Sequence, residues 1–305
     1  MPTSFDESVT EEFRANGGKV GGPFQGANLL LLTTVGAKSG TRRTTPLGYV
    51  RHGDALLVVA SNLGATEHPH WYRNLLAHPT VDVEIGTRVF EALAVPAEGA
   101  RRDELFARVV KEAPGYADYQ AATDRTLPVV VLEPAAHPAG EEPREVRTLA
   151  DKILEVHDHL RAQLRLVTAD VDAHFAALAA HEGPGEPPAP SLGLRIRQRC
   201  LAFCQALEFH HTGEDGHLFP GIAQYHPHLT EVFDRLGAEH RTVARIQDAL
   251  VTLLADLGSA EPSLFRAELA EMTTELTAHL DYEEEVILPL VAEVPWPPAP
   301  PANTP

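Results

Sequence analysis

Two copies of one short pattern, His-x-x-x-Glu, constrain this chain more than any other feature of its sequence. The copies are 210–214 and 279–283, and each is followed, four residues after its glutamate, by two apolar residues and a proline. Because an α-helix turns once in about 3.6 residues, side chains four positions apart share one face and reach a common metal ion. Imidazole combined with carboxylate suits iron, manganese or zinc. The pair of motifs therefore predicts a helical metal-binding domain.

Helical periodicity extends through the region that contains both motifs, with apolar residues three or four positions apart. It predicts four long helices: one capped by Thr148, one through 194–207, one over about 229–257 and one that is capped by Ser263 and runs to about 294. Their short connections favour an antiparallel four-helix bundle at 148–294. The proline-rich tail, 295–305, is predicted to be disordered.

The first 135 residues show strand patterns instead. Apolar and β-branched runs with hairpin turns between them occur at 28–35, 44–51, 55–61, 81–85, 88–95 and 128–133. Helices are expected only at 69–77 and 101–113. This set predicts a split β-barrel at 1–135, joined to the bundle by a proline- and glycine-containing linker at 136–147. The predicted fold class is two-domain α+β.

The composition excludes several classes of partner. Residues 148–305 hold 24 acidic and 10 basic side chains, which is −14 of the chain's formal charge of −18. No basic face is offered to nucleic acid or to an anionic membrane. No apolar run approaches the roughly 20 residues that a transmembrane helix needs, and no secretion signal is recognisable. With only two cysteines, Cys200 and Cys204, we expect a cytoplasmic protein.

Histidines on all four predicted helices extend the metal site beyond the two motifs. His157 and His159 lie on the first helix and His240 on the third. At these residues, 148–294 resembles the hemerythrin-like His-His-Glu cation-binding family, whose bundle holds two non-heme iron ions. The resemblance selects His157 over His159 and implies bridging roles for both motif glutamates. The implied metal ligands are His157, His210, Glu214, His240, His279 and Glu283.

The chain departs from the oxygen-carrying members of that family at two positions. Ala244 stands where they have a second histidine on the third helix, and Glu284 stands where they have an aspartate. His159, His174 or Glu239 would be needed to fill the place of the lost histidine. The departure favours oxygen sensing or activation over reversible oxygen storage.

A basic turn between the first two predicted strands is the main candidate site in the barrel. The segment 36–43 combines two glycines with lysine, serine and arginine side chains, a composition able to bind a phosphate. Together with Ser61, Trp71 and a pair of tyrosines, it resembles the deazaflavin (F-420)-dependent nitroreductase and quinone reductase family, a split-barrel, flavin reductase-like fold. The resemblance implies cofactor contacts at Lys38, Ser39, Gly40, Arg43, Ser61 and Trp71, and catalytic roles for Tyr116 and Tyr119.

Two basic positions common in that family are replaced here by Ala37 and Asn62. Each charge-assisted contact is worth about 1.5–3 kcal/mol, so FMN or a short-tailed deazaflavin is an alternative cofactor. Our leading hypothesis is a redox protein in which the barrel passes hydride to a quinone- or nitro-type acceptor. The bundle would sense or activate dioxygen or peroxide. The alternatives are a non-catalytic sensor with an inert barrel and a biosynthetic di-iron oxygenase. Resemblance to split barrels that pair through sheet edges also implies a homodimer.

Overall fold

The computed structural model describes residues 5–134, 145–180, 193–255 and 262–296. The chain separates into two compact units, Met1–Ala136 with Gly193–Ala202, and His137–Leu192 with Phe203–Pro305. Most of the predicted linker, and the predicted tail from residue 297 onward, lie outside the described residues. Among the described helices, none combines the length and hydropathy that crossing a bilayer demands.

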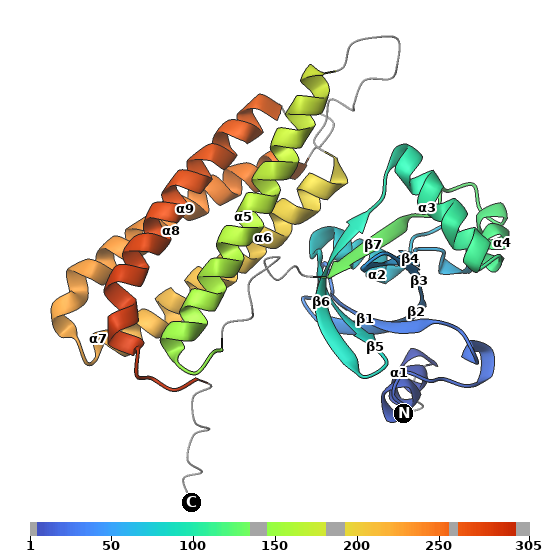
Figure 1. The fold of residues 1–305 in the computed structure, drawn as a ribbon, viewed down its shortest axis with the longest axis horizontal. Helices are drawn as coiled ribbons and strands as arrows, with labels where there is room; N and C mark the ends of the chain where they lie inside the picture. Colours follow the sequence, from blue (N-terminus) through green and yellow to red (C-terminus); the bar gives the residue numbers. More distant parts are fainter. Residues whose placement is uncertain (1–4, 135–144, 181–192, 256–261, 297–305) are drawn as a thin grey trace, which may run out of the picture. The chain divides into compact units, whose positions relative to one another are not determined.

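The first unit is built on one antiparallel sheet with the strand order β2-β1-β5-β6-β7-β4-β3. Figure 1 shows the sheet curling into a half-barrel, which confirms the predicted fold of this part of the chain. Its strands are β1 (Leu29–Val35), β2 (Arg42–Gly48), β3 (Val50–His52), β4 (Ala55–Val59), β5 (Thr80–Ile85), β6 (Arg88–Pro96) and β7 (Val129–Pro134).

The predicted strand at 44–51 is two strands in the structure, divided at Tyr49. Before Tyr49, β2 pairs with β1; after it, β3 pairs with β4. The backbone N–H of Tyr49 donates to the Asn28 carbonyl at 3.1 Å, at the point where the partner changes. The two strands stand at opposite ends of the strand order, so this change of partner accompanies the curling of the sheet. Sequence alternation continues across such a point and does not reveal it.

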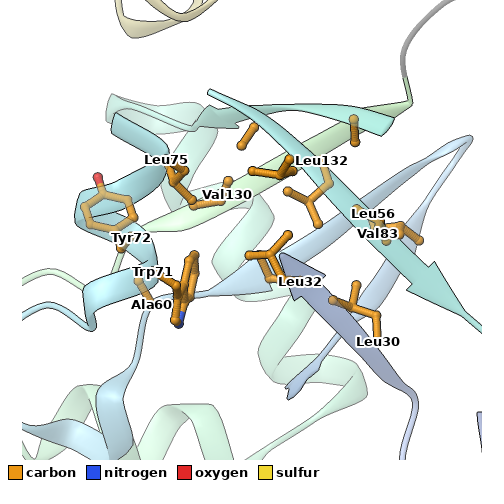
Figure 2. Close-up of a cluster of buried hydrophobic side chains, with 14 residues drawn as sticks. Leu30, Leu32, Leu56, Ala60, Trp71, Tyr72, Leu75, Val83, Val130 and Leu132 are labelled. Carbon is orange, nitrogen blue, oxygen red and sulfur yellow. The ribbon is translucent and has the colours of Figure 1, made fainter. Parts of the chain in front are cut away.

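Strand β1 is buried on both faces, which explains its uninterrupted apolar sequence. Leu30 and Leu32 belong to the largest apolar cluster of the unit, with Trp71 and Leu75 (Figure 2). On the other face, Leu29 and Leu31 contact the helix α1 (Phe5–Ala15) through Val9 and Phe13. We did not predict α1, because its short apolar stripe lies in an otherwise acidic and polar segment. The other helices of this unit are α2 (His70–Ala77), α3 (Gly99–Glu112) and α4 (Gly115–Ala121), with short 3-10 turns η1 (Gly22–Phe24) and η2 (Asn62–Gly64).

Four long helices account for most of the C-terminal region, as predicted. They are α5 (Leu149–Ala179), α6 (Leu194–Gly213), α8 (Thr230–Ala255) and α9 (Pro262–Val291). Thr148 caps α5: its hydroxyl accepts the Asp151 N–H at 3.1 Å, and the Asp151 carboxylate accepts the Thr148 N–H at 2.9 Å. This reciprocal arrangement satisfies donors that the first helical turn leaves open.

Ion pairs show how three of these helices run. Arg161 pairs with Asp281 and Arg266 pairs with Asp172, so α5 and α9 are antiparallel. Arg245 of α8 pairs with Glu271 of α9, while His240 lies beside His279, so this pair is antiparallel too. Figure 1 shows α5, α8 and α9 side by side. Between α6 and α8 the chain forms a π-helical turn η3 (Glu214–Leu218), the short helix α7 (Phe219–Ala223) and a 3-10 turn η4 (Pro227–Leu229).

Candidate metal centre and cofactor site

Seven metal-ligating side chains meet among the helices of the C-terminal region. They form two groups, and within each group the candidate donor atoms all lie within 4.8 Å of one another. The groups are His157, His210, Glu214 and Glu283, and His211, Glu214, His240 and His279. All six residues that the sequence singled out are present. His211 is the seventh, and sequence reasoning missed it.

Each glutamate lies between the two groups. Glu214 has Oε1 at 3.1 Å from His210 Nε2 and Oε2 at 3.5 Å from His240 Nε2. Glu283 Oε2 lies 3.5 Å from His157 Nε2 and 3.7 Å from His279 Nε2. A carboxylate that bridges two cations needs this arrangement, because its shared negative oxygens offset the repulsion between the cations.

Three of the histidines are oriented by carboxylates behind them. Nδ1 of His157 lies 2.9 Å from Glu284, that of His240 lies 2.9 Å from Asp215, and that of His279 lies 3.1 Å from Glu239. Each imidazole therefore presents Nε2 to the centre, as metal-ligating histidines generally do. Glu239, one candidate for the place of the lost histidine, and Glu284, at the position of the family's aspartate, lie in this outer layer.

In this outer layer, the Glu284 carboxylate is held in place by an ion pair. Arg161 donates to Glu284 at 2.6 Å. Burial acts to raise the pKa of the Glu284 carboxyl, but hydrogen bonds from His157 and Arg161 outweigh it and lower this pKa to about 2. Glu284 is therefore ionised and accepts a hydrogen bond from His157 Nδ1–H, an arrangement that turns Nε2 of the ring toward the centre.

The donor set fits a pair of divalent cations. Both carboxylate oxygens of Glu214 and Glu283, and Nε2 of His211, are buried and make no hydrogen bond within the described part of the chain. Burial raises the pKa of Glu214, with a further contribution from Glu283, and burial lowers the pKa of His210 to about 2. Buried groups without partners are costly. Bound cations would satisfy all of them together, and the neutral His210 imidazole is already in the protonation state that a metal requires.

The remaining candidates for the lost histidine do not join either group. His159 Nε2 lies 3.5 Å from the Gln163 amide, and His174 lies against Phe175 with ring centroids 5.9 Å apart. Ala244 is exposed, one turn beyond the buried His240. A histidine at 244 would therefore not line the buried centre. The signal that sequence reasoning overlooked is the doublet His210-His211, since only one of two adjacent helical residues was expected to face inward.

In the N-terminal unit, the basic turn connects β1 to β2 and is exposed to solvent. Its backbone donors are largely used internally: Gly40 N–H donates to Gly36 O at 2.8 Å and Ala37 N–H donates to Asn74 Oδ1 at 3.1 Å. The exposed side chains of Lys38 and Arg43 make no ion pair or hydrogen bond with the described residues. A phosphate would therefore be bound by side chains more than by the turn backbone. Ser39 and Gly40 lie exposed in the same turn.

The other predicted contacts lie in different environments. Trp71, a predicted cofactor contact, is only 6% exposed and packs in the core cluster (Figure 2). Ser61 is half-buried, and its carbonyl accepts a hydrogen bond from Arg125 at 2.6 Å. Arg125 also donates to the Ala60 and Ala65 carbonyls, so it holds the backbone on both sides of Ser61.

The two tyrosines predicted to be catalytic lie side by side on α4. Their ring centroids are 5.9 Å apart in an edge-on arrangement. A Cβ atom on Gly48 of β2 would lie 3.3 Å from the Tyr116 hydroxyl, so the glycine leaves that hydroxyl room. Burial, with a smaller contribution from Tyr119, raises the pKa of Tyr116. Tyr116 therefore stays protonated at neutral pH, and its hydroxyl can donate a hydrogen bond.

Asn74 on α2 is hydrogen-bonded to both the basic turn and β1, and replacing it tests how much these two contacts stabilise the protein. Its amide nitrogen donates to Thr34 Oγ1 at 3.1 Å while its oxygen accepts the Ala37 N–H. Asn74→Ala leaves both groups without their partner, so we expect the free energy of unfolding to fall by about 1–3 kcal/mol in urea titrations. Arg73→Ala, whose ion pair with Glu67 is exposed, is the control and should change it by less than about 1 kcal/mol. Equal effects of both substitutions would contradict this role.

Comparisons with known proteins match the two parts of the chain separately. A family model described as F420H(2)-dependent quinone reductase matches residues 7–134, and one described as Hemerythrin HHE cation binding domain matches residues 148–291. An F420H(2)-dependent quinone reductase of Mycobacterium tuberculosis (strain ATCC 25618 / H37Rv) is 43% identical over 126 residues. That match covers 39% of this chain and 83% of the relative.

Two solved structures are similar to the N-terminal part. One, described as an F420-H2 dependent reductase (FDR-A), is 41% identical to this chain and has a TM-score of 0.33. The match covers 35% of this chain and 94% of the chain of that structure. Another, described as a domain-swapped dimer, is 37% identical and has a TM-score of 0.35. The match covers 44% of this chain and 100% of the chain of that structure. Through residues 7–134, which match that family model and the M. tuberculosis relative, the chain belongs to the F420H(2)-dependent quinone reductase family, a family of oxidoreductases, while residues 148–291 match the Hemerythrin HHE cation binding domain model.

Proposed function

We propose that the N-terminal unit oxidises reduced F-420 and reduces a quinone- or nitro-type small molecule. The observation that carries the proposal is a pair of unpartnered cations, Lys38 on the basic turn and Arg43 at the start of β2, in the segment that the family resemblance assigns to the cofactor's phosphate. Reduced deazaflavin supplies a hydride, and a quinone that accepts a hydride and a proton becomes the quinol. FMN is the alternative cofactor, since the basic residues common at positions 37 and 62 are absent.

The residues of the N-terminal unit would have distinct roles in binding the cofactor and the acceptor. Lys38, Ser39, Gly40 and Arg43 bind the anionic tail, and the segment at Ser61 lies along the cofactor. Trp71 supports that surface from the core. Tyr116, held protonated by burial, donates a hydrogen bond to the acceptor oxygen, and Tyr119 positions it through their edge-on contact. The geometry of Tyr116 beside Gly48 supports this assignment.

For the C-terminal unit we propose a di-iron centre that senses or activates dioxygen or peroxide. Its ligands would be His157, His210, Glu214, His240, His279 and Glu283, with the two glutamates as bridges. The unpartnered buried oxygens of both glutamates, each beside histidines of both groups, support the proposal. Iron supplies one-electron chemistry when bound. The protein contributes a dry site and carboxylates that orient three of the imidazoles.

Two other functions follow from the same two units. The chain would be a non-catalytic oxygen or iron sensor if the barrel binds no cofactor, or a biosynthetic oxygenase if turnover needs iron and oxygen but no deazaflavin. We place the protein in the cytoplasm, because the chain has only two cysteines and both are buried thiols that form no disulfide. We also propose a homodimer formed by the barrel, which size-exclusion chromatography with light scattering will test.

One preparation of the full chain tests these proposals together. After anaerobic, iron-supplemented expression, we expect two irons per chain by metal analysis and quenching of F-420 fluorescence on binding. Reduced F-420 should be oxidised only when a quinone such as menadione is added. Iron content well below one per chain would contradict the metal proposal. Failure to bind either F-420 or FMN would contradict the enzyme and favour the sensor.

A further inference from the structure

We propose that His211 is a seventh metal ligand, which supplies a third imidazole to one of the two metal positions. This inference rests on the proposed metal centre and deepens it. Neither the sequence motifs nor the family resemblance singled out His211. With His211, the cluster holds five imidazoles.

The surroundings of His211 are those of a ligand. The residue is 7% exposed, and its Nε2 atom is buried with no hydrogen-bond partner among the described residues. A ligating atom of the ring lies within 4.8 Å of those of Glu214, His240 and His279. A buried imidazole nitrogen without a partner has lost its hydrogen bond to water and has formed no other, which raises the free energy of the folded state. A cation shared with the other three side chains would compensate it.

Adjacent positions on α6 serve the two groups separately. His210 Nε2 lies 3.0 Å from His157 Nε2, in the first group. Successive helical residues point about 100° apart, so His211 is directed elsewhere. Its ring stacks on His240, with centroids 4.0 Å apart, and meets His279 edge-on at 5.1 Å. Glu214, at the start of the π-helical turn η3, belongs to both groups. π-helical turns are frequent at functional sites.

The consequence is two metal positions with different donors. One position has two imidazoles, from His157 and His210, with the carboxylates of Glu214 and Glu283. The other has three imidazoles, from His211, His240 and His279, with Glu214 and the second proposed bridge, Glu283. The two positions differ by one imidazole, so the two metals should differ in affinity and in spectrum. Loss of His211 should affect only the second position.

Titration of the metal-free full chain with Co2+, under anaerobic conditions, tests the proposal. We expect two Co2+ per chain with distinct visible spectra. In His211→Ala the second binding event should weaken by at least about 10–100-fold, the range seen even for outer-layer partners, while the first is kept. Added imidazole should restore the second event. His159→Ala, a histidine of α5 outside both groups, is the matched control and should behave like the unmodified chain.

A second measurement needs no substitution and so does not depend on the folding of a variant. With 113Cd in the full chain and 15N-labelled histidine, we expect five imidazole nitrogens coupled to cadmium. Four coupled nitrogens, or two Co2+ bound by His211→Ala with unchanged affinity, would overturn the role of His211 and leave the metal centre standing. Failure of the unmodified chain to bind Co2+ or Cd2+ would overturn both.

Discussion

Glu283→Gln will shift the stability of the helical unit in opposite directions with and without metal. Glu283 is fully buried, and neither carboxylate oxygen has a hydrogen-bond partner among the described residues. An amide of the same shape removes an uncompensated buried acid, so the metal-free protein should become more stable. The same change removes a bridging ligand, so metal affinity should fall by at least about 100-fold, the upper range for outer-layer partners.

Both effects are measurable on the same samples. Helical circular dichroism during thermal unfolding should give a higher midpoint for metal-free Glu283→Gln than for the unmodified metal-free chain. Added Fe2+ or Co2+ should raise the midpoint of the unmodified chain strongly and that of the variant weakly. Glu285→Gln is the matched control, because Glu285 is exposed on the same helix two residues away. A variant that is destabilised without metal would show that Glu283 has a purely structural role.

Lys38→Ala combined with Arg43→Ala will weaken F-420 binding by roughly 100-fold or more. Each charge-assisted contact contributes about 1.5–3 kcal/mol, and 1.4 kcal/mol corresponds to tenfold in affinity. Both side chains are exposed and unpartnered in the described chain, so their removal should leave the free energy of unfolding almost unchanged. Fluorescence titration with F-420 gives the dissociation constant directly.

This binding experiment has two controls: a variant of a neighbouring arginine, and a deazaflavin without the phosphate-bearing tail. Arg42→Ala lies in the same hairpin, but Arg42 is paired with Asp82 on β5, so it should change F-420 affinity far less. A deazaflavin that lacks the phosphate-bearing tail should bind the double variant and the unmodified chain equally. Affinity losses that are the same for both ligands, or for Arg42→Ala, would refute a phosphate site at Lys38 and Arg43.

The comparison of sequence and structure shows where local patterns are sufficient. His210 and Glu214 lie four apart, and their side chains meet at 3.1 Å, because helix geometry alone determines that distance. The four long helices and the cap at Thr148 follow from local periodicity and local hydrogen bonds in the same way. In the barrel, five of the predicted strand segments match single strands, since alternation with hairpin turns is also a local signal.

Other features depend on contacts between distant parts of the chain. Tyr49 separates two strands that pair with different partners, and no local pattern marks that change. Trp71, expected to contact the cofactor, is buried, because it packs with residues of several strands in the core cluster. Ala244 suggested an open place in the metal site, yet it faces solvent.

The sequence by itself determined that paired His-x-x-x-Glu motifs share helix faces and that a bundle of four helices follows a sheet. The periods of the helix and the strand are short, so neighbouring residues are enough to reveal them. Only the tertiary structure decided which histidines meet, and it placed His211 with His240 and His279. Which atoms meet between helices depends on how those helices are rotated and aligned against each other. That relation is set by packing across the whole core and is not contained in the spacing of any one motif.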